Sequence, residues 1–160
     1  MNQLRVPVAF GSVRLVWDEQ GLLQRILLEK EAADVPSFMT DMARRIQRAC
    51  DFGEPIGEVD WSICAKMSSF QEEIRDVVGL IPYGETRTYG WVARHLGRVQ
   101  LARAVGRALS ANPFPLLVPC HRVQSEPARR FLGQDFFDIK QILLKKEELY
   151  RSPMFSNAFY

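Results

Sequence analysis

The sequence predicts an α/β N-terminal domain, with a small antiparallel sheet and one helix, followed by a mostly α-helical C-terminal domain. The second domain is expected to contain a helix-turn-helix and a short strand that carries Cys120. Two observations support this prediction. The first third of the chain has short β-rich runs between turns, and the remainder has helical periodicity. The 160 residues, 47% hydrophobic and 25% charged, suit a globular chain of one or two domains.

The beginning of the chain has the pattern of three strands and one helix. The β-rich runs lie at 5–10, 12–17 and 22–28. Gly11 and the turn 18–21 separate these runs. Segment 37–50 is expected to be helical, because apolar side chains repeat there every four residues, at Phe38, Met42 and Ile46. Segment 51–57 has two glycines and one proline, so it is the expected linker, and we place the domains at 1–57 and 58–160.

Two amphipathic helices are expected near the two ends of the second domain. The first, 70–80, has an apolar face made of Phe70, Ile74, Val77 and Val78, and a turn at 82–84 ends it. The second, 138–150, has an inner face defined by Ile139, Ile142, Leu143 and Tyr150. Glu147 lies at the edge of this inner face, where a carboxylate can reach into the protein.

A helix-turn-helix pattern occupies residues 88–111. Thr88 is a suitable N-cap for a helix at 89–96, Gly97 terminates that helix, and a second helix follows at 99–111. Three apolar residues on the second helix recur every four positions and form its core stripe: Leu101, Val105 and Leu109. A parallel row of small residues consists of Ala102, Gly106 and Ser110, and Arg103 and Arg107 flank it. This row fits either close helix–helix packing or a helix that lies in a DNA groove.

The charge pattern agrees with a polyanion partner without requiring one. The net charge is only +2, yet the basic residues from 87 to 107 are interrupted by no acidic residue. They are Arg87, Arg94, Arg98, Arg103 and Arg107. Such a run forms either a basic patch for nucleic acid or a solvated helix face. No apolar run is long enough to span a membrane and no secretory signal is visible, so an intracellular protein is expected.

Three cysteines and two histidines limit the possible chemistry. An odd cysteine count without a secretion signal argues against a disulfide framework, and the sequence has too few ligands at useful spacing for a zinc site. Cys50 and Cys64 are interpreted as buried apolar side chains, with a bridge between them left open.

The segment 115–123 is the expected chemical centre. Residues 116–118 are an apolar run suited to a buried strand, and Pro119 stops it directly before Cys120. Only a thiolate attacks carbon well, and the neighbouring His121 can accept the thiol proton, directly or through a water molecule, while Glu147 orients the imidazole. The contact between Cys120 and His121 requires a turn or a bridging water. A purely structural cysteine is the competing interpretation.

The motifs together resemble the O6-alkylguanine-DNA alkyltransferases, also called methylated-DNA–protein-cysteine methyltransferases. The resemblance covers about the last 90 residues. The segment 119–123, Pro-Cys-His-Arg-Val, is similar to the acceptor-cysteine signature. The family's DNA-binding helix and the hinge after it are similar to residues 103–106 and Asn112-Pro113. The family's segment that leads into the helix-turn-helix is similar to residues 82–86 followed by Tyr89.

The resemblance implies repair of O6-alkylguanine, and also of O4-alkylthymine, in double-stranded DNA by irreversible, single-turnover transfer of the alkyl group to Cys120. It implies catalytic roles for Cys120, His121, Glu147, Tyr89 and Asn112. The residues expected to contact DNA are Ala102, Arg103, Gly106, Arg107, Ser110, Tyr89 and Arg122. It further implies minor-groove binding, nucleotide flipping with Arg103 filling the gap, and a monomer that needs no metal or other cofactor.

One segment departs from the family pattern. The family has a glycine-rich loop after the acceptor cysteine, whereas the segment 125–136 retains only Gly133 and contains the bulky Phe131 and Leu132. This departure keeps a second hypothesis open, a non-catalytic relative that binds alkylated DNA and recruits other repair factors, although such relatives replace the cysteine. A third, a thiol hydrolase, would need an oxyanion hole and an open cleft, and the sequence indicates neither.

Overall fold

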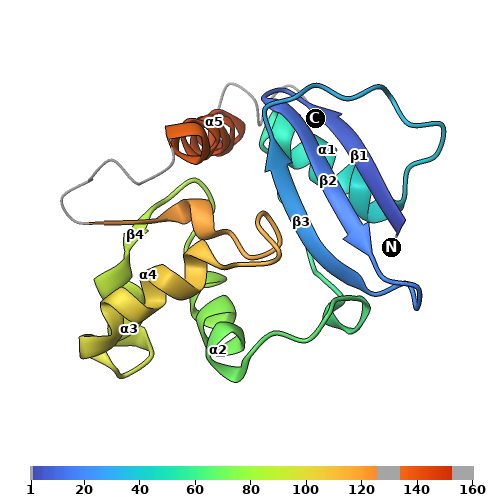
Figure 1. The fold of residues 1–160 in the computed structure, drawn as a ribbon. Coiled ribbons are helices and arrows are strands. Elements are labelled where there is room, and N and C mark those ends of the chain that lie inside the picture. Colours follow the sequence, from blue (N-terminus) through green and yellow to red (C-terminus); the bar gives the residue numbers. More distant parts are fainter. Residues whose placement is uncertain (1, 126–133, 153–160) are drawn as a thin grey trace.

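The computed structural model of the protein describes residues 2–125 and 134–152, with the side chains of 134–138 not described. The N-terminal sheet has the order β1-β2-β3 and is antiparallel throughout (Figure 1). Its strands are β1 (Asn2–Val8), β2 (Gly11–Trp17) and β3 (Leu23–Glu29). Val6 pairs with Val13, and alternation of side chains places both in the core together with Leu15. The three predicted strands are confirmed, and their ends lie within two residues of the prediction, except that β1 begins three residues earlier than expected.

Helix α1 (Asp41–Phe52) lies against one face of this sheet. It begins later than the predicted residue 37, because the Thr40 hydroxyl accepts a hydrogen bond from the Ala43 amide and caps the helix there. Phe38, expected on the inner face, therefore precedes the helix and is 72% exposed. The buried face consists of Ala43, Ile46 and Cys50, and Gly53 ends the helix in the left-handed conformation, at φ 72°.

The C-terminal half contains the predicted helices and two very short strands. In chain order its elements are η1 (Trp61–Ile63), α2 (Ser69–Val78), β4 (Arg87–Thr88), α3 (Tyr89–His95), η2 (Val99–Leu101), α4 (Ala102–Ser110), η3 (Cys120–Arg122), β5 (Val123–Gln124) and α5 (Gln134–Arg151). Thr88 caps α3 through the Trp91 amide, and Gly97 follows α3 at φ 69°, so the predicted start and end of this helix are confirmed. None of the helices in the described part of the chain has the length and apolarity needed to cross a bilayer.

The expected strand at 116–118 does not form, and that prediction was wrong. Leu116 has a positive φ of 76°, and only an isolated bridge joins Pro115 to Val118. The prolines on both sides lack an amide hydrogen for a strand ladder, and Leu116 and Leu117 instead pack into the N-terminal core. Cys120 consequently begins the single turn η3, directly before β5, rather than lying on a strand.

The two halves of the chain share a core along α1 and α5. Phe114, Leu116, Leu117, Ile139 and Leu143 belong to the same buried cluster as the inner faces of the sheet and α1. Helix α5, seen nearly end-on in Figure 1, contacts α1. The second cluster lies among α2, α3 and α4 and includes Val118, Cys120 and Val123. The division between residues 57 and 58 stays a prediction.

Candidate active site

Cys120 lies in a turn that several backbone hydrogen bonds hold. Its amide donates to the Val118 carbonyl at 2.7 Å, and the Asn112 side chain donates to that carbonyl at 3.2 Å. The Asn112 carbonyl oxygen also accepts from the Phe114 amide at 3.0 Å, so one side chain joins the end of α4 to the cysteine turn. Cys120 is 8% exposed. This is the turn that a Cys-His contact requires.

His121 and Glu147 form a buried pair next to this cysteine. The distance between His121 Nε2 and Glu147 Oε1 is 2.6 Å, and each side chain is 6% exposed. Because the carboxylate can only accept, Nε2 carries the hydrogen and Nδ1 is the nitrogen with a lone pair for a proton. Burial lowers the pKa of His121, although the bond to Glu147 opposes this effect.

Glu147 receives hydrogen bonds on both carboxylate oxygens. Arg122 Nε donates to Oε2 at 2.9 Å, Arg122 Nη2 donates to Oε1 at 2.9 Å, and the Gly84 amide donates to Oε2 at 3.0 Å. Burial alone would raise the pKa of Glu147, but the bonds from His121 and Arg122 outweigh it and hold this pKa at about 2. Glu147 therefore stays ionised and orients His121 instead of taking a proton.

The thiol of Cys120 and the imidazole of His121 are both uncharged at rest. Burial raises the pKa of the Cys120 thiol, while a hydrogen bond from Asn112 and the charge of Lys140 lower it in part. Because the pKa of the Cys120 thiol is raised and the pKa of His121 is lowered, a separated thiolate–imidazolium pair is disfavoured in the resting protein. Transfer of the thiol proton to His121 would therefore have to accompany a reaction of the sulfur.

Lys140 is a site residue that sequence reasoning missed. It lies on α5 two turns before Glu147, is 6% exposed, and its ammonium donates to the Val123 carbonyl. Burial lowers its pKa, and the charge of Cys120 opposes that change. A spacing of seven residues on one helix face relates Lys140 to Glu147, and this spacing is the signal that could have identified it.

Tyr89 lies beside Cys120 at the start of α3. Parallel pairing of β4 with β5 matches Arg87 to Val123 and Thr88 to Gln124, which brings the start of α3 to the cysteine turn. Burial, with a smaller contribution from the charge of Cys120, raises the pKa of Tyr89 to about 12, so the phenol keeps its hydrogen. A methyl group built on Gly106 would lie 3.9 Å from the Tyr89 ring, which packs against this part of α4.

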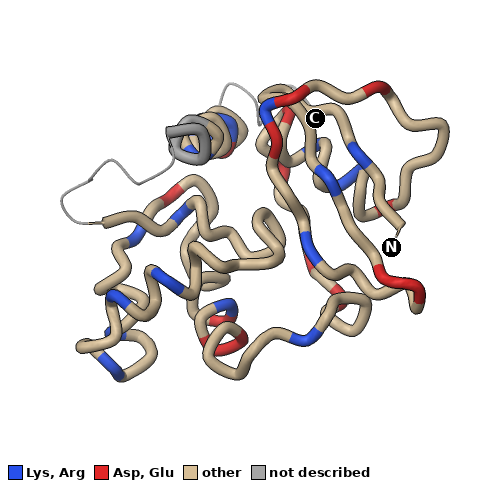
Figure 2. The backbone as a smooth tube through the Cα atoms, viewed as in Figure 1, with Lys and Arg blue, Asp and Glu red and all other residues tan. Residues whose placement is uncertain are grey.

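The predicted DNA-contacting residues of α4 share one helix. Arg103, Arg107 and Ser110 are exposed, and Ala102 and Gly106 are half-buried between them. Ser110 Oγ donates to the Gly106 carbonyl at 3.0 Å. Basic residues gather around α3 and α4 (Figure 2), although two members of the basic run, Arg87 and Arg98, are paired with Glu85 and Glu73.

Arg122 is not brought to the surface of α4. Its side chain is 12% exposed and its guanidinium faces Glu147, so its position differs from that of the other predicted DNA contacts. Tyr150, expected on the inner face of α5, is 37% exposed and contacts Tyr83 edge to face.

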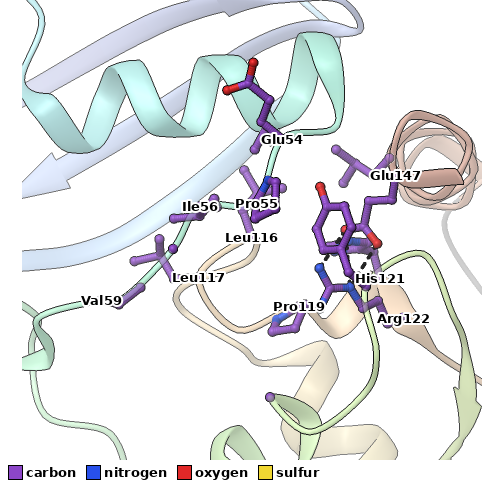
Figure 3. A pocket seen from close by; sticks show the side chains of 15 residues that line it. Glu54, Pro55, Ile56, Val59, Leu116, Leu117, Pro119, His121, Arg122 and Glu147 are labelled. Carbon is purple, nitrogen blue, oxygen red and sulfur yellow. Dashed lines mark hydrogen bonds and ion pairs between the residues drawn. The ribbon is translucent and has the colours of Figure 1, made fainter. Parts of the chain in front are cut away.

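A cavity of about 240 Å³ lies at the seam between the two halves of the chain (Figure 3). Its lining includes Ile56, Leu117, His121, Arg122 and Glu147. Cys120 does not line it, so this cavity is not the place where a substrate meets the sulfur.

The sequence predicts that the segment 125–136 alters a nucleotide pocket. Most of this segment, residues 126–133, lies outside the described residues, and the side chains of 134–136 are not described either. Among the residues that the structure describes, no three His, Cys, Asp or Glu side chains are grouped as a metal site requires, and all three cysteines are free.

Comparison with known proteins identifies similar sequences and folds. Residues 69–149 match the sequence model for the DNA-binding domain of 6-O-methylguanine DNA methyltransferase. The chain is 32% identical over 145 residues to the methylated-DNA–protein-cysteine methyltransferase of Methanosarcina acetivorans, covering 86% of this chain and 92% of the relative. The corresponding protein of Methanosarcina mazei is 33% identical, with 85% and 90% covered. The crystal structure of O6-methylguanine methyltransferase from Mycobacterium tuberculosis has the same fold, with a TM-score of 0.78 at 23% identity and 99% of both chains covered.

Proposed function

Because this chain belongs to the 6-O-methylguanine DNA methyltransferase family, we propose that it repairs O6-alkylguanine in DNA by moving the alkyl group onto Cys120. The observation that carries the proposal is the buried His121–Glu147 pair, 2.6 Å apart, next to a buried free cysteine. A structural cysteine needs no ionised carboxylate fixed behind the neighbouring imidazole. The arrangement suits a sulfur nucleophile that is activated only when a substrate is bound.

In the proposed reaction the Cys120 sulfur attacks the alkyl carbon that is bonded to O6. The S–C bond forms, the C–O bond breaks, and the thiol proton passes to His121 Nδ1, directly or through water. The leaving guanine takes up this proton, which returns His121 to its neutral form. Tyr89, which keeps its phenolic hydrogen, donates a hydrogen bond to the base as negative charge develops there. The thioether product is not hydrolysed, so each molecule reacts once, and no cofactor takes part because the substrate carries the group.

DNA is the proposed partner, because the matched domain is by its description a DNA-binding domain. We assign the contacts to α4, whose half-buried Ala102 and Gly106 let a minor groove approach the helix between the exposed Arg103 and Arg107. An alkylated base inside a duplex cannot reach the thiol of a cysteine that is only 8% exposed, so the nucleotide must be flipped out, with Arg103 filling the gap. The same geometry would admit O4-alkylthymine. The protein is proposed to act as a monomer.

A mass-spectrometric transfer assay tests the proposal. Incubation with duplex DNA that contains O6-methylguanine should add one methyl group to the peptide with Cys120 and convert the lesion to guanine. Cys120→Ala should lose transfer and retain binding to the duplex, whereas Cys50→Ala and Cys64→Ala should retain both, since these buried cysteines lie outside the site. Binding without any mass change in the natural protein would reject transfer and favour the non-catalytic alternative.

A further inference from the structure

In the proposed function, Cys120, His121 and Glu147 form a proton relay. Arg122 is fixed to this relay through its contacts with Glu147. Its guanidinium forms a two-pronged contact with the carboxylate, with Nε and Nη2 each 2.9 Å from an oxygen. The Nη2 group and His121 Nε2 donate to the same oxygen, Oε1 (Figure 3). A planar guanidinium fits a carboxylate in this way, and a lysine ammonium cannot form both contacts at once.

The other side of the Arg122 guanidinium is also fixed. Its central carbon lies 4.6 Å from the centre of the Tyr83 ring. The Tyr83 hydroxyl in turn donates to the Gly53 carbonyl at the end of α1, which belongs to the N-terminal half. Next to Tyr83, the Gly84 amide donates to Glu147 at 3.0 Å. Arg122 is therefore held between an aromatic face and a carboxylate, and DNA could contact it only by breaking these interactions.

The position of Arg122 changes the charge that His121 experiences. An imidazole beside an ionised carboxylate normally becomes a stronger base, because the carboxylate stabilises the imidazolium. Here Arg122 neutralises the same carboxylate at the same oxygen. Among the residues that the structure describes, the other charged or titratable groups around His121 are Cys120 in its own turn, Lys140 on α5, and Tyr83 and Glu54, which line the seam cavity with it. Lys140 acts in the same direction as Arg122.

We propose that Arg122 is a positioning residue of the relay: it locks Glu147 in place and keeps His121 in its neutral, proton-accepting form instead of contacting DNA. This role rests on the proposed function, since a relay is meaningful only if Cys120 attacks a substrate. Together with burial, which lowers the pKa of His121 most, it explains how an orienting carboxylate can lie 2.6 Å from His121 without converting it to an imidazolium that could take no further proton. It also gives Arg122, expected from sequence to contact DNA, a place in the chemistry.

The protonation state of His121 can be measured without alkyl transfer, because the chain has only two histidines. NMR titration of the imidazole resonances should show the midpoint of His121 rising by about one pH unit or more in Arg122→Gln, since a nearby charge shifts a pKa by roughly 1–3. Arg122→Met is a second neutral variant in case the first does not fold. Arg122→Lys keeps the positive charge, so it should shift the midpoint less than either. The assignment of His121 is made with His95→Gln, and the exposed His95 serves as an internal control.

A matched control uses another two-pronged arginine–carboxylate contact. Arg48 donates to Glu54 at 2.6 and 2.7 Å on the rim of the same seam, but it does not touch His121. Arg48→Gln should shift the His121 midpoint far less than Arg122→Gln, because no hydrogen bond joins Glu54 to His121 in the described part of the chain. An Arg122→Gln midpoint that equals the natural one would overturn the proposal, as would an equal shift in Arg122→Lys and Arg122→Gln, because charge would then not be the cause.

The kinetic readout separates this proposal from the proposed function. The rate of Cys120 alkylation by free O6-benzylguanine should fall at low pH as His121 is protonated, and in Arg122→Gln this fall should begin at higher pH. Binding of Arg122→Gln to undamaged duplex should match that of the natural protein. Absence of alkylation in the natural protein would reject the proposed function, while the His121 titration would still decide the role of Arg122. Weakened duplex binding with an unshifted titration would assign Arg122 to DNA instead.

Discussion

Replacing Glu147 by glutamine removes one negative charge from the buried relay while nearly preserving the shape of the side chain. The pKa of Glu147 lies at about 2, compared with about 4.5 for an unperturbed carboxyl group. Since one pKa unit corresponds to ~1.4 kcal/mol, ionised Glu147 stabilises the folded protein by about 3 kcal/mol at pH 7. This agrees with the ~3–5 kcal/mol lost when one partner of a buried ion pair is removed. Glu147→Gln should therefore unfold about 3 kcal/mol more easily at pH 7.

The pH dependence gives this prediction its specific signature. Because the folded pKa is depressed, the stabilisation is complete above about pH 4.5 and is lost as the pH falls towards 2. The deficit of Glu147→Gln relative to the natural protein should shrink to about half by pH 3. Urea unfolding curves of both proteins at pH 7, 5 and 3, followed by circular dichroism, measure this difference.

Glu148 provides a matched control on the next position of the same helix. Its side chain is 66% exposed and pairs only with Lys145 at 3.0 Å among the contacts that the structure describes for it. Glu148→Gln should change the free energy of unfolding by less than about 0.5 kcal/mol at every pH. A Glu147→Gln deficit below that size, or a deficit of equal size at pH 7 and pH 3, would refute the argument that Glu147 is held ionised in the folded protein.

The remaining predictions concern the cysteine turn, the seam and helix α4. Asn112→Ala should cost about 1–3 kcal/mol in urea unfolding and slow alkylation, because it removes bonds to the Val118 carbonyl and the Phe114 amide; a rate equal to that of the natural protein would contradict its place in the site. Gly53→Ala should cost on the order of 3 kcal/mol, since the new methyl group would overlap the Lys146 carbonyl of α5. Gly97→Ala, at a similar φ with open space around it, should cost only about 1 kcal/mol; equal losses would refute the packing argument. Arg103→Ala should slow repair of duplex DNA at least about tenfold and leave alkylation by free O6-benzylguanine nearly unchanged, and equal slowing of both would exclude its role in the duplex.

Local patterns in the sequence predicted the elements well where one short stretch of chain decides the structure. Runs of β-favouring residues between turns identified the sheet, and Thr88 and Gly97 marked the ends of α3. The prediction failed at residues 116–118, where an apolar run between two prolines was interpreted as a strand. Apolar character reports burial, but it does not distinguish a strand from a buried loop with a positive φ at Leu116.

Cys120, which we propose as the alkyl acceptor, its neighbour His121 and the basic helix-turn-helix could be identified from the sequence, because residue type and spacing along a few turns of chain are sufficient to define them. The tertiary structure decided what surrounds Glu147. It brought the Gly84 amide, 63 residues away in the chain, to one carboxylate oxygen and turned Arg122 inwards to both. It also buried Lys140 next to Cys120. Hydrophobic periodicity records which side of a helix is buried, whereas the partners of a buried charge depend on how α5 packs against the rest of the chain, and no local pattern contains that information.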